Sequence, residues 1–494
     1  MKKLFHVYLF VFAMGFESMT LEMVLSRLFA PYFGTSLVVW GAVIGTVLIA
    51  LSLGYYIGGR WADKKPKKSL LFSIGIIASI LISVITFLFD LVFSNLNPEN
   101  LFITSFDLLI FLLIVSLLFF AVPVFLFGCI VPFAVRIVTK DVSHSGTDAG
   151  KIFSYSTIGS IFGVFIPAFI TIPYLGTRET ILGLVLFGLL VSLFYFRKKP
   201  YLYLLILIPI LLYFTSDYFY KQQSDKDLVV EETQYQLVRV TDEGDHKEMK
   251  IDTGFGIQSV YYPDAELSQN YWDSFAVLPY VMNDGKKEKD VLVLGMAGGT
   301  ATAQLRKLTG EDFTFNVTGV EIDPELTEIA REEFNMNEEV VTDDARLFLQ
   351  KTDKTYDLII IDVYAKESFI PSHLATYEFF EEVESKLNEQ GIVAVNINAP
   401  SKESEFYTKF TRTFAGAYNF PYSVKVNEYW NYLLIGSKEE LDFNKVRNID
   451  NPKVVTLKHW FNDVDMLTFG EGDYFSDNKS DIDQLSMKMY FEGF

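Results

Sequence analysis

Seven apolar runs, each close to the length that crosses a bilayer, occupy the first 216 of the 494 residues. A helix needs about 20 apolar residues to span the hydrocarbon core of a membrane. The runs cover residues 4–29, 37–59, 69–94, 105–137, 152–174, 177–196 and 200–216. The sequence therefore predicts an α-helical transmembrane bundle of about seven spans over residues 1–216, embedded in a lipid bilayer as a multi-pass protein of the cell membrane.

Two of these runs depart from the simple pattern. The fourth is long and contains Pro123 and Pro132, so we interpret it as one kinked helix whose end emerges from the apolar phase. The seventh is short and contains Pro209. A re-entrant or interfacial segment in place of a crossing is therefore expected at residues 200–216 before any other run.

Lys and Arg gather in the loops on one side of the predicted bundle. These loops hold Lys2 and Lys3, the Arg60–Lys68 cluster, Arg136 and Lys140, and Arg197–Lys199. The positive-inside rule then places the N-terminus in the cytoplasm. Seven crossings would put the remainder of the chain outside the cell.

The charge balance changes sign along the chain. Residues 1–216 contain 15 Lys and Arg and 9 Asp and Glu, whereas the rest contains 27 and 52. We expect a small β-rich domain and linker over residues 217–285 and a nucleotide-binding domain over 286–494. The acidic surplus repels a phosphate backbone, so a nucleic-acid partner is not expected.

The first apolar run contains charged residues. Glu17, Glu22 and Arg27 all fall within or beside it, although charges inside a bilayer are costly and usually face a partner or a polar cavity. One interpretation is an ion pair between helices, or placement near a helix end. The other is a substrate path through the bundle.

The glycines of 54–59 and 159–163 are better explained by close helix packing than by a ligand.

The second half alternates strands with helices. Residues 228–262 predict a small antiparallel β-unit with a turn at 243–245. Beyond it, apolar strands are expected at 290–294, 317–323, 340–341, 358–362 and 392–396, with helices at 301–309, at 325–334 and from 346. This order is typical of a parallel, doubly wound, Rossmann-like sheet.

Ligands of such sheets bind at the carboxyl ends of the strands, near the switch in strand order. Gly295, Gly298 and Gly299 follow the first strand, Glu321 ends the second, Asp344 ends the third and Asp362 ends the fourth. Glycine lets the backbone approach a ligand closely, and a carboxylate after the second strand can accept ribose hydroxyls. Because the loop is not a full G-x-G-x-x-G, an adenosyl-sulfonium ligand is favoured over NAD.

Other acids in this region have simpler roles. Asp323 precedes Pro324 and is expected to cap the following helix. Asp343 is expected to be a cap or a solvated neighbour of Asp344.

Longer motifs now point to a family. They are Asp252–Gln258, Tyr271–Pro279, Val320–Asp323, Asp344-Ala345, Ile361-Asp362 and Tyr432–Lys438. With them, the stretch from about Glu231 to Lys438 resembles spermidine synthase, a polyamine aminopropyltransferase, with a fainter echo at Ser476–Asn478. Residues 15–36 resemble bacterial membrane proteins that fuse a transporter-like bundle to such a domain.

The resemblance implies a donor, an acceptor and an assembly. The donor would be decarboxylated S-adenosylmethionine, or S-adenosylmethionine itself, the acceptor a small-molecule amine or polyamine, and the protein a homodimer without a metal. The residues expected to hold the donor are Gln258, Gly295, Gly298, Gly299, Glu321, Asp344, Ala345 and Asp362. The residues expected in catalysis are Asp362, Tyr271 and Tyr364.

The departures from the family pattern lie in the acceptor region. Two expected catalytic acids are replaced by Gly298 and Ala365, and Trp272 stands where the family has His or Gln. Those acids hold the ammonium of the donor and orient the attacking amine, which needs an acceptor for its proton. Glu367 or Asp273 could substitute.

Three functions remain open. The first is a membrane-bound aminopropyltransferase with a divergent acceptor site. The second is an S-adenosylmethionine-dependent methyltransferase or other group transferase, and the third is a non-catalytic nucleotide- or polyamine-binding domain that regulates the bundle. The supply of the adenosyl donor favours a cytoplasmic C-terminal domain, whereas the loop charges favour an outside one.

Overall fold

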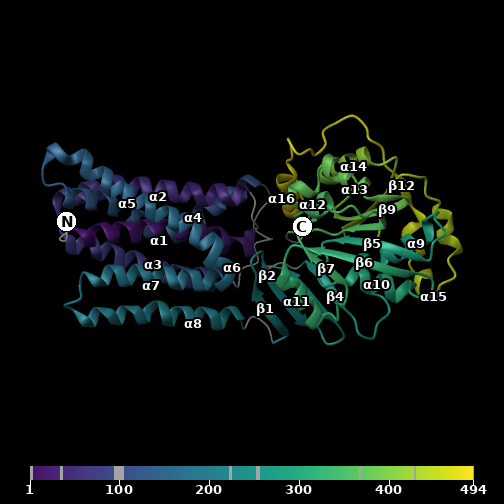
Figure 1. Ribbon diagram of the computed structural model, residues 1–494, viewed down its shortest axis with the longest axis horizontal. Helices are drawn as coiled ribbons and strands as arrows, with labels where there is room; N and C mark the ends of the chain where they lie inside the picture. Colours follow the sequence, from purple (N-terminus) through teal and green to yellow (C-terminus); the bar gives the residue numbers. More distant parts are fainter. Residues whose placement is uncertain are drawn as a thin grey trace. The chain divides into compact units, whose positions relative to one another are not determined.

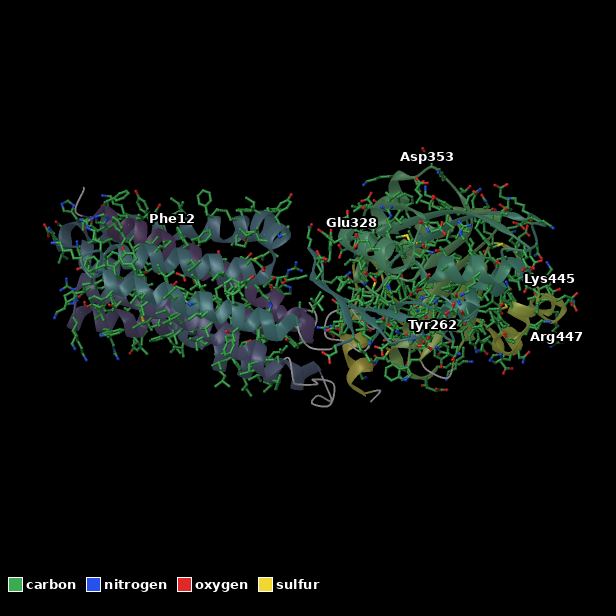
Figure 2. All side chains as sticks on the ribbon, turned by 90° about the horizontal axis from the view of Figure 1, so that it is seen from below. Phe12, Tyr262, Glu328, Asp353, Lys445 and Arg447 are labelled. Atoms are coloured by element: carbon green, nitrogen blue, oxygen red, sulfur yellow. The ribbon has the colours of Figure 1, made fainter. Side chains whose placement is uncertain are left out.

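The computed structural model describes residues 4–33, 37–93, 105–221, 225–251, 256–365, 369–427 and 430–492. The chain divides into two compact units, Met1–Asp225 and Lys226–Phe494. We call them the helical unit and the α/β unit. Figure 1 shows both, and Figure 2 shows that nitrogen and oxygen atoms are sparse along the middle of the helical unit and dense over the α/β unit.

The helical unit follows the predicted apolar runs. Its helices are α1 (Phe5–Phe33), α2 (Leu37–Lys64), α3 (Lys68–Phe93), α4 (Ser105–Val138), α5 (Ser145–Ile166), α6 (Ile172–Leu175), α7 (Thr177–Phe194) and α8 (Leu207–Lys221). A π-helical turn, Pro167–Thr171, joins α5 to α6. Among the described residues, six helical segments are long and apolar enough to cross a membrane. Pro123 and Pro132 lie inside one continuous α4.

The seventh predicted run is a shorter helical segment. A 3₁₀ turn, Pro200–Ile206, leads into α8, which packs against α3 and α7. Near the far end of α8, the Tyr213 hydroxyl donates to Glu179 of α7 at 2.6 Å, and the Ser216 hydroxyl donates to Asp90 of α3 at 2.5 Å. The segment therefore runs back along the length of α7, as Figure 1 shows, and does not lie across the end of the bundle.

The glycine motifs of the helical unit serve packing, as predicted. A Cβ on Gly159 would lie 2.0 Å from the carbonyl oxygen of Phe12, and one on Gly163 would lie 2.3 Å from that of Phe16. A Cβ on Gly54 would lie 2.4 Å from the carbonyl oxygen of Phe125. These glycines bring α5 against α1, and α2 against α4, at backbone distance.

The expected ion pair of Glu17 is not formed. Glu17 lies in the middle of α1, is fully buried, and has no hydrogen-bond partner for either carboxyl oxygen within the described ranges. The interpretation of this residue as half of an ion pair, or as a residue near a helix end, is therefore wrong.

The predicted antiparallel β-unit is a four-stranded sheet with the order β1-β2-β3-β4. Its strands are β1 (Asp227–Glu232), β2 (Leu237–Asp242), β3 (Lys247–Ile251) and β4 (Ile257–Tyr261). The turn expected at residues 243–245 joins β2 to β3.

The second sheet has eight strands in the order β12-β10-β11-β9-β8-β5-β6-β7. The strands are β5 (Glu288–Leu294), β6 (Thr314–Glu321), β7 (Glu339–Thr342), β8 (Tyr356–Ile361), β9 (Leu387–Asn398), β10 (Phe420–Lys425), β11 (Asn431–Ser437) and β12 (Val464–Met466). The five predicted strands are confirmed as β5 to β9, all parallel. The sheet as a whole is mixed, because β10, β11 and β12 are antiparallel. The short connection between β10 and β11 permits only antiparallel pairing of those two strands.

Helices cover both faces of this sheet (Figure 1). They are α9 (Leu278–Val281), α10 (Thr300–Thr309), α11 (Pro324–Glu333), α12 (Ala345–Lys351), α13 (Tyr377–Glu384), α14 (Glu405–Ala417), α15 (Pro452–Val455) and α16 (Ile482–Glu492). Within β5, Val291 and Val293 enter one apolar core, whereas Leu292 and Leu294 enter the other. Burial on both faces explains why the parallel strands are continuous apolar runs.

Candidate functional site at the carboxyl edge of the parallel strands

The strand order reverses between β5 and β8, and their carboxyl ends touch there. Gly295 follows β5 with φ +83°, and a Cβ on it would lie 2.4 Å from the carbonyl oxygen of Asp362. The Asp362 N–H donates to Leu294 at 3.0 Å. Gly295 and Asp362, both predicted site residues, therefore meet at the switch point where open α/β sheets bind ligands.

The loop after Gly295 is packed against the small sheet. The Gly298 N–H donates to the Ser259 hydroxyl at 2.8 Å. A Cβ on Gly298 would lie 2.6 Å from the Cβ of Ser259 and 3.1 Å from the ring of Phe334. The position at which the resemblance expects an acid is therefore closed by Ser259 and Phe334. Gly299, with φ +78°, is the N-cap of α10.

Glu321 ends β6 and turns its carboxylate to the same loop. It accepts from the Ala297 N–H at 3.0 Å and from the Asp323 N–H at 3.2 Å, and it is 7% exposed. Burial raises the pKa of Glu321, and the backbone N–H donors oppose that rise. Each carboxylate oxygen has two lone pairs, so both can still accept a hydroxyl. The residue fits a ribose diol.

Asp362 is the acid in this region with the most side-chain donors. Its Oδ2 accepts from the Tyr271 hydroxyl at 2.7 Å and from the Trp272 Nε1 at 3.3 Å, and its Oδ1 accepts from the Asn396 Nδ2 at 3.1 Å. Burial raises its pKa to about 6, although these donors lower it. Burial and the neighbouring Asp362 charge hold the pKa of Tyr271 well above its usual value, so Tyr271 remains a donor.

Tyr364 is hydrogen-bonded to the end of β9, the strand that also carries Asn396. Its hydroxyl donates to the Asn396 carbonyl at 3.1 Å and accepts from the Asn398 N–H at 3.1 Å. Asn431 of β11 in turn donates to the Asn396 Oδ1 at 3.0 Å. Tyr364 thus holds the strand end that supports Asp362, and among the described residues no hydrogen bond joins its hydroxyl to that carboxylate. Burial and the Asp362 charge raise the pKa of Tyr364 well above its usual value.

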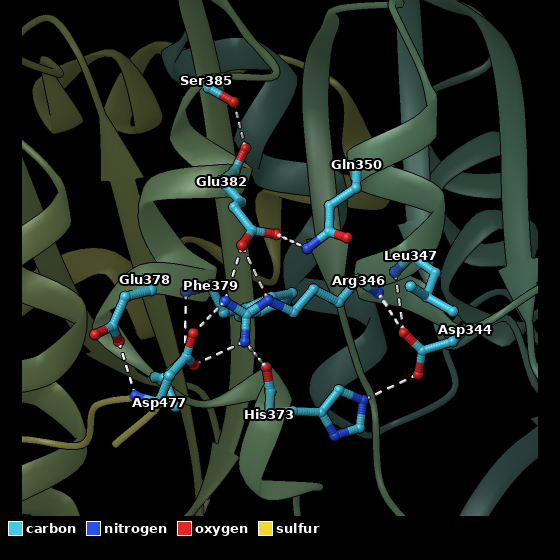
Figure 3. A network of polar contacts seen from close by, with 11 residues as sticks. Asp344, Arg346, Leu347, Gln350, His373, Glu378, Phe379, Glu382, Ser385 and Asp477 are labelled. Atoms are coloured by element: carbon cyan, nitrogen blue, oxygen red, sulfur yellow. Dashed lines mark hydrogen bonds and ion pairs between the residues drawn. The ribbon is translucent and has the colours of Figure 1, made fainter. Parts of the chain in front are cut away.

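Asp344 is the cap of α12, whereas the sequence predicts Asp343 as a cap or a solvated neighbour. Asp343 instead accepts from the Asp344 N–H at 3.0 Å and pairs with Lys351. The Asp344 carboxylate accepts from the N–H groups of Arg346 and Leu347 at 3.0 Å each, and His373 contacts it at 2.9 Å (Figure 3). Burial alone would raise the pKa of Asp344, but these hydrogen bonds lower it overall. Ala345, the first residue of α12, is buried.

Arg346 anchors the start of α12, where Asp344 lies. Its guanidinium donates to Glu382 of α13 at 2.8 Å and to both carboxylate oxygens of Asp477 at 2.8 Å (Figure 3). Asp477 also accepts from the Thr376 hydroxyl at 2.8 Å. The faint resemblance at Ser476–Asn478 therefore corresponds to a contact that anchors the start of α12.

Two other acids have their carboxylates hydrogen-bonded within the fold. Asp323 caps α11, as predicted, and also accepts from the Thr233 hydroxyl at 2.6 Å. Asp273 is fully buried and accepts from the Ser268 N–H at 3.0 Å and from Gln304 at 2.5 Å. Asp273 therefore does not substitute for the missing acids.

For three of the predicted positions the described part of the chain shows no contact with the site. Glu367 and residues 252–255 lie outside the described residues. Gln258 lies on β4 at an irregularity in its pairing with β3, one residue before the Ser259 that contacts Gly298.

Sequence reasoning missed Asn396, Ser259 and His373. Asn396 had a signal, because it is a polar residue near the end of an apolar parallel strand. Ser259 and His373 had none, since each approaches from an element outside the nucleotide-binding strands.

Comparisons with known proteins find similarity to one family of transferases. Residues 276–445 match the family described as the spermine/spermidine synthase domain. Over those residues the α/β unit is similar to this domain, and the chain is similar to polyamine aminopropyltransferases over most of its length.

Two relatives illustrate the extent of the similarity. The chain is 23% identical over 462 residues to polyamine aminopropyltransferase 2 of Aquifex aeolicus, with 88% of each chain covered. It is 32% identical over 169 residues to the "Probable polyamine aminopropyl transferase" of Bifidobacterium longum, a match that spans 34% of this chain and only 36% of that protein.

Solved structures give a weaker match. The chain aligns with a probable spermidine synthase from Corynebacterium glutamicum at a TM-score of 0.38 and 17% identity, over 49% of this chain and 97% of that one.

Proposed function

We propose that this protein is a membrane-bound aminopropyltransferase. It moves an aminopropyl group from decarboxylated S-adenosylmethionine to an amine or polyamine, at an acceptor site that diverges from the family pattern. The observation that carries the proposal is Asp362, a carboxylate with a pKa of about 6 held by three donors at the switch point. The matched domain and the relatives named above support the same chemistry.

The reaction asks for positioning and for one proton acceptor. The amine nitrogen attacks the propyl carbon next to the sulfonium, a C–N bond forms, the C–S bond breaks, and methylthioadenosine leaves with the electron pair. An ammonium has no lone pair, so the attacking amine must first give up a proton. At neutral pH a carboxyl with a pKa of about 6 is mostly ionised and can accept that proton or orient the neutral amine.

The donor would lie across the carboxyl ends of β5, β6 and β7. Glu321 accepts the ribose hydroxyls, the Gly295–Gly299 loop passes beneath the sugar, and Asp344 with Ala345 faces the adenine. Tyr271 and Trp272 hold the Asp362 carboxylate in one orientation, which reduces the reorganisation needed at the moment of attack.

The acceptor region holds fewer acids than the family pattern. Gly298 is closed by Ser259, Ala365 carries no carboxylate, and Asp273 is committed elsewhere. A carboxylate that would bind the distal ammonium of a diamine acceptor is therefore missing. We expect an acceptor with less positive charge than a diamine, or one held by residues that the family does not use.

The same closure supports a second candidate. The acid missing at Gly298 would grip the ammonium of an aminopropyl donor, so its loss fits a donor that carries a different group. S-adenosylmethionine-dependent methyl transfer, through attack of the acceptor on the sulfonium methyl, is the alternative that this observation favours.

We place the protein in the membrane through its apolar helices and carry over the homodimer of the family. Because the donor is made in the cytoplasm, we propose that the α/β unit is cytoplasmic. Since α8 runs back along α7, this side requires the N-terminus and the loops rich in Lys and Arg to lie outside, against the positive-inside rule. Protease added to sealed inverted vesicles should then digest the α/β unit, whereas protection of this unit would contradict the proposed side.

Turnover by the full chain tests the reaction. Protein in lipid nanodiscs is incubated with a panel of mono-, di- and triamines and either decarboxylated S-adenosylmethionine or S-adenosylmethionine, and the products are identified by mass spectrometry. We expect methylthioadenosine and an aminopropylated amine from the decarboxylated donor only. S-adenosylhomocysteine from the second donor would establish the alternative, and no product with a panel of mono-, di- and triamines would favour a binding domain.

A further inference from the structure

Glu17 is a buried acid that the transfer chemistry does not use. It lies in the middle of α1 and is fully buried. Neither of its carboxyl oxygens has a hydrogen-bond partner in the part of the chain that the structure describes. The Ser192 hydroxyl of α7, also fully buried, has none either.

The groups around this carboxyl leave it unsolvated. Gly188 of α7 packs directly on it, because a Cβ on that glycine would lie 2.1 Å from the Glu17 Oε2. The Ser79 hydroxyl of α3 faces the carboxyl but donates to the Gly75 carbonyl at 3.0 Å. The contact with Gly188 leaves no room on that side for a hydrated metal ion or an organic cation.

Charged groups do not approach Glu17 from the helices packed against α1. Residues 183–193 of α7, 75–86 of α3, 39–54 of α2 and 110–128 of α4 contain no titratable side chain. Residues 152–166 of α5 contain Tyr155, whose ring packs on Tyr8 near the start of α1.

Within α1, the nearest charged residues are farther along the axis. Glu22 and Arg27 lie about 7.5 and 15 Å farther along the helix axis than Glu17, at about 1.5 Å per residue. Glu17 therefore has no ionic partner on its own helix in the described structure.

We propose that Glu17 is a proton-binding site of the helical unit, closed by the contact between α1 and Gly188 of α7. An ionised carboxylate here would lose its hydration with no cation nearby and with no donor but the Ser79 hydroxyl, which already donates to Gly75, and this is costly in an apolar interior. A proton removes that cost and is the one cation that needs no additional space.

Release of the proton requires movement. The O–H bond of the carboxyl breaks, the proton passes to water, and the carboxylate that remains needs hydration. Water reaches it only when α7 separates from α1 at Gly188. The helical unit thus has a closed, protonated state and an open, ionised state, and this inference does not depend on the transfer reaction.

Infrared spectroscopy of the full chain in lipid nanodiscs tests the proton site. Difference spectra across a pH series report the carbonyl stretch of a protonated carboxyl, and exchange into D₂O identifies it. We expect a band that is lost in Glu17→Gln and kept in Glu22→Gln, a matched control on the same helix. If Glu17→Gln does not accumulate, Glu17→Asp must move the band to a new frequency. A spectrum unchanged by either Glu17 substitution would overturn the proposal.

A pair of glycine substitutions tests the closure. Gly188→Ala should push α7 away from the carboxyl and lower its proton affinity about tenfold or more, which is a shift of about one pH unit in the midpoint of the band. Gly183→Ala is the matched control on α7, because a Cβ there meets nothing within 4 Å. Equal midpoints in the two variants would show that the contact at Gly188 does not retain the proton.

Discussion

The two units each bury a carboxyl group, and they treat it in opposite ways. In the α/β unit, Asp362 receives three side-chain hydrogen bonds and has a pKa of about 6. In the helical unit, Glu17 receives none among the described residues. A carboxylate that receives several donors can carry a charge at neutral pH, whereas one without donors must be neutral or find a cation.

The difference follows from how each unit is built. The carboxyl edge of a parallel sheet gathers polar residues at several strand ends, so two donors from the 3₁₀ turn Tyr271–Val277 and one from β9 converge on Asp362. The helical unit instead packs its helices closely through glycines, and at Gly188 this packing removes the space that a donor to Glu17 would need.

The largest expected effect is on catalysis at Asp362. Asp362→Asn keeps the shape and removes the charge, so kcat should fall by about 10²- to 10⁴-fold, the usual contribution of a positioned base. Product formation by mass spectrometry measures it. Asp465→Asn, at an exposed acid of β12 paired with Lys402, is the control and should retain activity. Full activity in Asp362→Asn would remove this residue from the mechanism.

A smaller effect is expected when the missing acid is restored. Gly298→Asp would force its Cβ to 2.6 Å from that of Ser259, so the free energy of unfolding should fall by about 1–3 kcal/mol. Urea unfolding of the full chain measures the loss, and Ser259→Gly in the same chain should recover part of it. A stable Gly298→Asp protein with a higher rate would mean that the loop is more adaptable than its contacts suggest.

The smallest effect is a change in pH dependence. Because the pKa of Asp362 is about 6, activity should decline as the pH falls through 6. Trp272→Phe removes one donor to the carboxylate, so its pKa and the acidic limb of the profile should rise by less than about one unit. If the apparent pKa on the acidic side of the pH–activity profile were unchanged or lower in Trp272→Phe, that pKa would not belong to Asp362.

Stability should respond with a defined sign over the same range. The folded pKa of Asp362 lies above its ordinary value of 3.8, so between pH 3.8 and about 6 the folded state holds a proton that the unfolded state has lost. This group alone therefore makes the protein less stable as the pH rises through that window. Asp362→Asn should remove that component from the pH dependence of the urea midpoint.

Local sequence patterns predicted the parallel strands and the acids at their ends. Glu321 and Asp362 each close an apolar run, and such positions share one edge of the sheet. Asp323 was assigned as a cap because Pro324 follows it. The antiparallel end of the sheet was not predicted, since the pairing of β10 to β12 depends on contacts between distant segments.

The partners of the site residues were harder to foresee. Ser259 closes the space at Gly298 from a different sheet, and His373 reaches Asp344 from a separate loop. The choice of Asp344 over Asp343 as cap depends on backbone dihedral angles that two adjacent aspartates do not reveal. The isolation of Glu17 follows from Gly188, which lies 171 positions farther along the sequence.

The most direct test of the adenosyl site is calorimetry of the full chain in nanodiscs with decarboxylated S-adenosylmethionine, S-adenosylmethionine and methylthioadenosine. We predict that the decarboxylated donor binds most tightly and that Glu321→Ala weakens all three ligands by at least about tenfold, the loss expected when hydrogen bonds to a charged group are removed. Affinity that survives Glu321→Ala, or no binding of any of the three, would contradict the placement of the ribose on the carboxylate at the end of β6.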